Sequence, residues 1–242
     1  MDVEQIIFSE HIAVVKAFDF YIPRCQDLSS WQLFVNFCTE YLEKNHHEKE
    51  EKLIFSAVRL DPRIRMGGPL CTLYFDQYLQ GPAIARSQKV IKDILTELKI
   101  ALPDQNDFIK PQWGDDFSSD LLNNSPLLIP AGDHVAGRML LRFVQFLLSL
   151  ENPSIDGKIQ IETNFSSNNE ISFKKIEESI NTIFFHYREI QVDHFVREEK
   201  CFLKMCQSLL SAEDWSNIAT EILNHYPLIT DDLLSKHFAT TQ

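Results

Sequence analysis

Long stretches of helical hydrophobic spacing constrain the fold of this chain more than any other feature. Apolar side chains recur every three to four residues through 3–22, 29–58, 131–150 and 173–210, the spacing of one face of an α-helix. Only 7 glycines and 10 prolines occur among 242 residues, which disfavours a turn-rich β architecture. We therefore predict an all-α protein in which four long helices bury their apolar faces against one another as an up-down four-helix bundle.

The predicted bundle is interrupted and extended. The block between the second and third core helices has turn signals, one helical stretch at about 84–102 and a polar segment after it. A shorter helix is expected at about 212–225. We predict a single domain over 1–242. Its core comprises 3–58 and 131–210, its insertion 59–130, and its C-terminal helix and tail 211–242.

Charge and composition exclude several classes of function. The formal net charge is −12, so the chain is a poor non-specific binder of nucleic acids or anionic membranes. No apolar run approaches the roughly 18 residues of a membrane span, and no basic leader precedes an apolar segment at the N-terminus. The cysteine number is odd, at 5, and no CxxC pair occurs, so free buried thiols and a cytoplasmic protein are expected.

Two histidine–glutamate pairs interrupt the apolar faces of the second and fourth predicted helices. His46 and Glu50 are four residues apart, as are His194 and Glu198, so each pair stacks on one helix face. A buried carboxylate without a partner is costly, and a metal ion removes that cost. Because helical bundles hold metals between facing helices in this way, the two pairs together predict a metal site.

Two more histidines give each predicted core helix one imidazole. If both glutamates bridge, two metal ions each receive two imidazole nitrogens and two carboxylate oxygens; an oxo or hydroxo bridge then leaves one position per ion for O₂, NO, peroxide or water. Mixed imidazole and carboxylate ligation favours iron or manganese, and zinc is a further candidate. The predicted metal ligands are His11, His46, Glu50, His134, His194 and Glu198.

A solvated charge run is the main alternative for residues 46–52. A single histidine–glutamate pair on a helix is most often such a run, but repetition on a second helix argues against it here. His47 is placed by helical phase on the outer face with Glu40, Lys44 and Glu51. We therefore expect His47 to lie at or near the surface, and to replace a ligand only if the helix phase differs by one residue.

Four motifs, in this order along the chain, resemble those of the hemerythrin-like family, also called HHE cation-binding domains. They are residues 9–11 (SEH), 46–55 (HHEKEEKLIF), 126–138 (PLLIPAGDHVAGR) and 193–199 (DHFVREE). The resemblance covers about 3–58 and 131–210. It implies a four-helix bundle around a non-haem di-iron site, with the six residues named above as ligands. The family's usual Gly-Gly-Pro occurs here at 67–69 and leads to Asp76 without a histidine, so we interpret 66–78 as a decoy or partial duplicate.

Departures from the oxygen-carrying members indicate which branch the chain is similar to. Arg138 stands where those members have a second third-helix histidine, and the His194–Glu198 pair replaces a fourth-helix Asp at longer spacing. The pattern is more similar to the sensing and iron–sulfur-repair branches. The expected function is therefore binding or sensing of O₂, NO, peroxide, iron or redox state. The alternatives are a peroxidase-like or repair enzyme, and a degenerate bundle that binds a protein partner, not identified by the sequence, through 59–130.

Overall fold

All secondary structure in the described part of the chain is helical. The computed structural model describes residues 1–65, 82–100, 110–112, 127–151 and 173–239, and no strand occurs among them. The first helix, α1 (Val3–Tyr21), begins after Asp2, whose carboxylate accepts the Gln5 amide in a reciprocal capping box, and a short 3₁₀ turn, η1 (Ile22–Arg24), follows it. The cap satisfies amide groups that the first helical turn leaves without partners.

The second long helix changes its winding along its length. It begins as α2 (Leu28–Phe37) after Asp27, which caps it. It continues through two π-helical segments, η2 (Cys38–His47) and η3 (Glu50–Phe55), and ends as α3 (Ser56–Val58). A π-helix bonds residue i to i+5 and is rare outside functional sites. This wider winding alters which side chains share a face.

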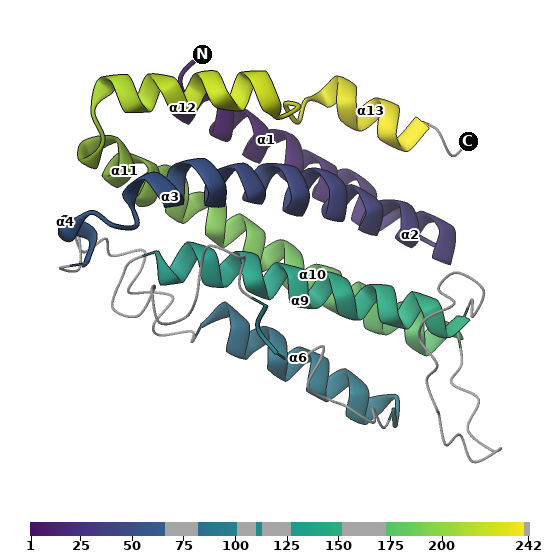
Figure 1. The fold of residues 1–242 in the computed structure, drawn as a ribbon. Coiled ribbons are helices and arrows are strands. Elements are labelled where there is room, and N and C mark those ends of the chain that lie inside the picture. Colours follow the sequence, from purple (N-terminus) through teal and green to yellow (C-terminus); the bar gives the residue numbers. More distant parts are fainter. Residues whose placement is uncertain (66–81, 101–109, 113–126, 152–172, 240–242) are drawn as a thin grey trace.

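The third and fourth long helices pack against each other. The third is α9 (Leu128–Glu151). The fourth is α10 (Phe173–Arg197), which passes through a π-helical segment, η4 (Glu198–Phe202), into α11 (Leu203–Leu209). α1 contacts the second helix and α10, while α9 contacts the second helix and α10. The long helices therefore form a closed four-membered arrangement, and they run side by side in Figure 1.

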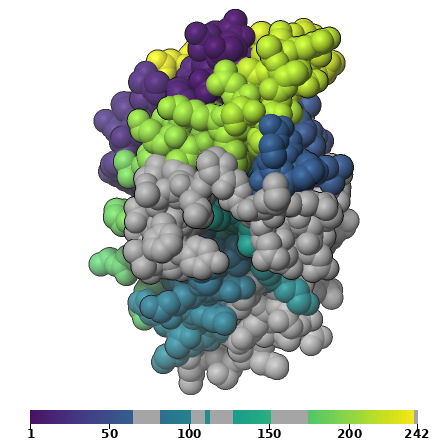
Figure 2. All heavy atoms as spheres, turned by 90° about the vertical axis from the view of Figure 1, so that its left-hand side faces the viewer, coloured from purple at the N-terminus to yellow at the C-terminus, as the bar shows by residue number. Residues whose placement is uncertain are grey.

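Shorter helices surround this bundle. α4 (Pro62–Arg65) follows the second helix, and α6 (Ala83–Glu97) lies within the predicted insertion and packs on α9 and α10. α12 (Ala212–His225), capped by Ser211, packs on α1. Figure 2 views the end of the bundle where α1 and α12 lie above and α6 below. α13 (Asp231–Ala239) is a helix where the sequence indicated only a weakly patterned tail, because Phe238 packs on Tyr21 with ring centroids 3.4 Å apart.

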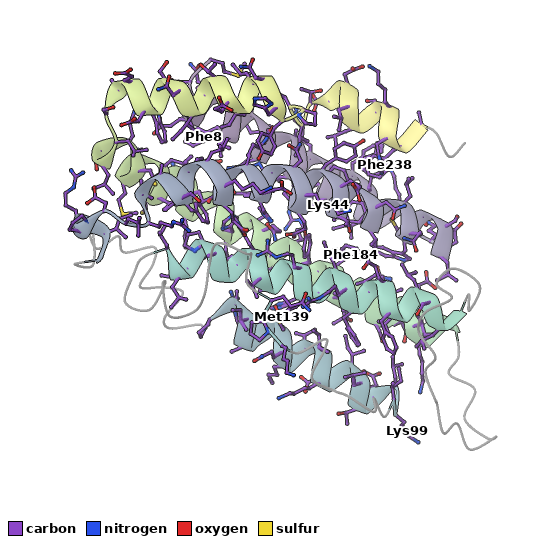
Figure 3. The ribbon with its side chains drawn as sticks, viewed as in Figure 1. Phe8, Lys44, Lys99, Met139, Phe184 and Phe238 are labelled. Atoms are coloured by element: carbon purple, nitrogen blue, oxygen red, sulfur yellow. The ribbon has the colours of Figure 1, made fainter. Side chains whose placement is uncertain are left out.

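The core consists of two apolar clusters with a buried polar layer between them. The larger cluster contains Phe184 and Met139, both labelled in Figure 3, and the smaller one contains Phe55 and Phe202. Each of the four long helices crosses both clusters. On each helix, buried charged or polar residues stand where it passes from one cluster to the other, at 10–11, 43–50, 133–134 and 197–198. The fold thus places polar segments of all four helices at one level.

The structure also bears on the predictions about membrane spans and cysteines. Among the described residues, no helix is long and apolar enough to cross a membrane. Cys25, Cys38 and Cys206 are free, but Cys201 is disulfide-bonded, which corrects the expectation that all five cysteines are free thiols; spacing along the sequence does not reveal which cysteines meet in space. The interpretation of 66–78 as a decoy falls outside the described residues.

Candidate metal centre

All six residues singled out from the sequence meet inside the bundle. His11 lies on α1, His46 on η2 and His134 on α9, while His194 lies near the end of α10. Glu50 and Glu198 are the first residues of the π-helical segments η3 and η4. Each of the six side chains is at most 2% exposed. The polar layer between the two apolar clusters therefore contains the predicted ligand set.

The six residues form two donor groups that share both glutamates. One group holds His11 and His46 with Glu50 and Glu198, and the other holds His134 and His194 with the same two glutamates. Within each group, one nitrogen or oxygen from every residue lies within 4.8 Å of all the others. Each group could hold a metal ion, and the two carboxylates would lie between the ions.

The Nε2 atoms of the imidazoles face one another in pairs. The Nε2 atoms of His11 and His46 are 3.1 Å apart, and those of His134 and His194 are 3.0 Å apart. Carboxylate oxygens of Glu50 and Glu198 lie 3.4 Å from these nitrogens. Two nitrogens bound at about 2.1 Å and at right angles to one ion would also lie about 3 Å apart. The spacing therefore matches a shared cation.

The glutamate oxygens lack hydrogen-bond partners. All four carboxylate oxygens of Glu50 and Glu198 are buried without one, which is unfavourable for a charged group. Burial, and then the negative charge of Glu198, raise the pKa of Glu50 well above its usual value. Burial also acts to raise the pKa of Glu198, but His194 and His11 outweigh it and lower that pKa. A cation would satisfy all four oxygens.

The pKa values of the candidate histidines shift in opposite directions when no metal is bound. Burial, followed by the charges of neighbouring histidines, lowers the pKa values of His46 and His134 well below the usual value. Burial acts in the same direction on His11, but the neighbouring carboxylates of Glu198 and Glu199 prevail and raise its pKa. Neutral imidazole is the form that binds metals, and the lowered pKa values of His46 and His134 favour that form.

A second set of carboxylates orients the imidazoles from outside. Nδ1 of His46 bonds to Glu10 at 2.7 Å and Nδ1 of His134 to Glu51 at 2.8 Å. In each case the acid comes from a different helix than the histidine. Histidine ligands commonly use their outer nitrogen in this way, which fixes the inner nitrogen toward the metal. His11 Nδ1 bonds to Glu199 at 3.0 Å. His194 Nδ1 lies 3.4 Å from Asp133 without a hydrogen bond.

These outer carboxylates close a ring around the bundle. The acid from α1 faces the histidine of the second helix, and the acid from the second helix faces the histidine of α9. The acid from α9 faces the histidine of α10, and the acid from the fourth helix faces the histidine of α1. This order is the order in which the helices contact one another. The ring was not predicted from the sequence, although a signal was present: each outer acid is adjacent in sequence to a predicted ligand. They are Glu10, Glu51, Asp133 and Glu199.

His47 is the residue for which helical phase gave the wrong location. It was expected near the surface but is fully buried, because the π-helical winding of η2 brings His46 and His47 inward together. Its Nδ1 bonds to Glu43 at 2.9 Å, while its Nε2 is buried without a hydrogen-bond partner. One donor atom of His47 lies within 4.8 Å of donors from His134 and His194.

Other candidates lie away from the centre or act on its surroundings. His225 is exposed on α12, and His237 lies beside the Leu33 carbonyl. The Tyr187 hydroxyl donates to Glu43 at 3.0 Å. Arg138 pairs with Glu51 at 3.0 Å.

Comparison with known proteins adds no family to this description. No family model, no curated protein and no solved structure matches the chain. The chemistry of the site is therefore inferred from the geometry of the polar layer.

Proposed function

We propose that this chain is a hemerythrin-like protein that binds two iron ions and uses them to bind O₂, NO or peroxide, or to sense iron or redox state. The observation that carries the proposal is the sharing of Glu50 and Glu198 by two buried donor groups, with all four carboxylate oxygens unsatisfied. A binding site for one ion would need neither the second pair of histidines nor two shared acids.

The donor chemistry supports iron as the metal. The groups offer imidazole nitrogens and carboxylate oxygens without thiolate, a set that suits iron and manganese. An iron pair, once bound, supplies a redox-active position for a small ligand. The chain's own residues hold the imidazoles through the outer carboxylates, and the two apolar clusters exclude water from above and below the polar layer.

Metal analysis of the purified protein tests the proposal. Protein expressed with added iron is expected to contain about two ions per chain and to absorb in the visible region when the ions are ferric and bridged. The double variant His46→Ala with His194→Ala is expected to lose both properties, and His225→Ala, an exposed control, to keep them. Well-folded wild-type protein without metal would refute the proposal.

The same sample separates the binding protein from an enzyme. A protein that binds or senses small ligands changes its visible spectrum on exposure to O₂, NO or azide without consuming them catalytically. Peroxide consumption that increases with iron content would instead favour a peroxidase-like activity.

Helix α6 buries Ile91, Ile94 and Leu95, and its contacts with α9 and α10 support a structural role for this part of 59–130.

A further inference from the structure

The polar layer has an approximate twofold repeat. The first core helix carries an acid followed directly by a histidine. The second carries a histidine with glutamates four and five residues after it. The last two core helices carry the same series. The matched sets are Glu10, His11, His46, Glu50 and Glu51 in the first half, and Asp133, His134, His194, Glu198 and Glu199 in the second.

One matched position differs in chemistry. The residue after His46 is His47, whereas the residue after His194 is Phe195. Both rings stack on a ligand histidine of the opposite half: His47 on His134 with centroids 3.9 Å apart, and Phe195 on His11 with centroids 4.0 Å apart, each at 14°. The same place therefore holds a potential nitrogen ligand in one half and a hydrocarbon ring in the other.

His47 shares with His46 and His134 a carboxylate at its Nδ1, in this case on its own helix. Its Nδ1 bonds to a carboxylate, that of Glu43, and its Nε2 is buried without a partner. Phe195 cannot coordinate a cation, so the two donor groups are unequal if His47 contributes. The donors of His47, His134 and His194 meet within 4.8 Å, which places His47 beside the two imidazoles of the second donor group.

Buried groups behind His47 hold its partner in place. Glu43 accepts the Tyr187 hydroxyl at 3.0 Å through its other oxygen, and Arg138 lies 3.9 Å from it. Gly137 leaves the room that these groups need, since a Cβ there would lie 2.9 Å from a Glu43 oxygen. The support is therefore built from the second, third and fourth core helices.

We propose that His47 is a fifth imidazole ligand, which binds the ion held by His134 and His194 and makes the two metal positions chemically unequal. This inference rests on the proposed function, because it requires that both positions bind metal. It goes further in assigning a ligand outside the six-residue set and in placing the asymmetry at a single pair of matched positions, 47 and 195.

His47→Gln tests the assignment, with His225→Gln as an exposed control. Iron affinity is measured by competition with a chelator, and the two iron environments by Mössbauer spectroscopy. Wild-type protein is expected to give two distinct iron signals. Loss of an outer partner of a metal ligand weakens metal binding about 10- to 100-fold. Loss of a direct ligand should therefore weaken the binding of one ion by at least that factor and change its signal, while the control matches the wild type.

Metal-free protein distinguishes a ligand from a structural residue. If His47 acts only in packing, His47→Gln lowers the melting temperature equally with and without metal. If it is a ligand, the variant loses stability mainly in the metal-loaded state. If the variant does not fold, an NMR measurement on the wild-type protein still tests the assignment. The ferrous protein should show exchangeable, paramagnetically shifted imidazole N–H resonances from His11, His46, His134 and His194, and an additional one from His47.

The outcomes separate this inference from the proposed function. Wild-type protein that binds no metal refutes both. Wild-type protein that binds two ions, with no additional imidazole resonance and with affinities and Mössbauer signals unchanged in His47→Gln, refutes the role of His47 alone.

Discussion

Replacing Lys49 by methionine should strongly destabilise the metal-free protein. Lys49 is fully buried, and its Nζ lies 2.6 Å from a Glu10 oxygen that is also fully buried. The same oxygen accepts the Ile229 amide at 3.1 Å, and the other oxygen holds His46. Methionine keeps the unbranched stem but leaves Glu10 without its cation.

The magnitude follows from the burial of both partners. Breaking a buried ion pair by removing one partner costs about 3–5 kcal/mol. For a chain of this size, each kcal/mol lowers the melting temperature by about 2–4 °C, so Lys49→Met should lower it by about 6–20 °C. Lys44→Met is the control, since Lys44 is 61% exposed and pairs with Glu40 at the surface, where such pairs contribute about 0–1 kcal/mol.

The cost of Lys49→Met should increase with pH. Burial raises the pKa of Glu10, and Lys49 counteracts that rise, so removing Lys49 raises the pKa further. A carboxyl group whose folded-state pKa is raised contributes stability below its unfolded pKa and loses it as the pH rises through the folded value. The difference from wild type should therefore be smaller near the ordinary glutamate pKa of 4.5 than at neutral or alkaline pH.

Thermal unfolding followed by circular dichroism on metal-free protein measures these effects. A double-mutant cycle with Glu10→Gln should give a coupling of about 1–3 kcal/mol. The reasoning is refuted if Lys49→Met costs no more than Lys44→Met, or if its cost is independent of both pH and Glu10.

Three other predictions concern the polar layer. Gly137→Ala would place a Cβ 2.8 Å from Gln191 and 2.9 Å from a Glu43 oxygen, so it should cost about 1–3 kcal/mol in urea unfolding; unchanged stability would contradict this packing. Glu51→Gln removes the charge that orients His134 and should weaken iron binding about 10- to 100-fold in chelator competition, whereas an exposed acid such as Glu40→Gln should have no effect. Because burial raises the pKa of Glu50 well above its usual value, metal-free protein should lose up to about 1.4 kcal/mol per pH unit from this group as the pH rises, and a pH series of unfolding measurements on Glu50→Gln should lack that contribution.

The long helices and the six-residue set were predictable because they depend on periodicity. The predicted ranges 29–58 and 173–210 correspond to continuous helical segments from Leu28 to Val58 and from Phe173 to Leu209. Glu50 and Glu198 could be identified because a charged residue in an apolar stripe conflicts with the surrounding pattern. The helices and these two glutamates could be predicted because both depend only on the spacing of residues along a single helix, which can be read from the sequence.

The location of His47 could not be predicted because it depends on π-helical winding. An α-helical projection places it with Glu40 and Lys44, which are exposed. The ring of outer carboxylates could not be predicted in full either, because each acid contacts a histidine on the neighbouring helix. Knowing that Glu10 meets His46 requires the order and level of the helices. Adjacency to a ligand provides a usable signal only once the ligands themselves are known.

The burial of so many ionisable groups at one level is itself an argument for a ligand. Replacing buried ion pairs with well-packed apolar residues is often neutral or stabilising, so this layer is poorly explained as a device for stability. The apolar clusters on either side contain large aromatic residues such as Phe55 and Phe184, and a continuous core would be the simpler way to hold four helices together. Carboxylate oxygens left unsatisfied between two such clusters become favourable when a positively charged group binds them, and metal cations fit both the charge and the donor atoms of this layer.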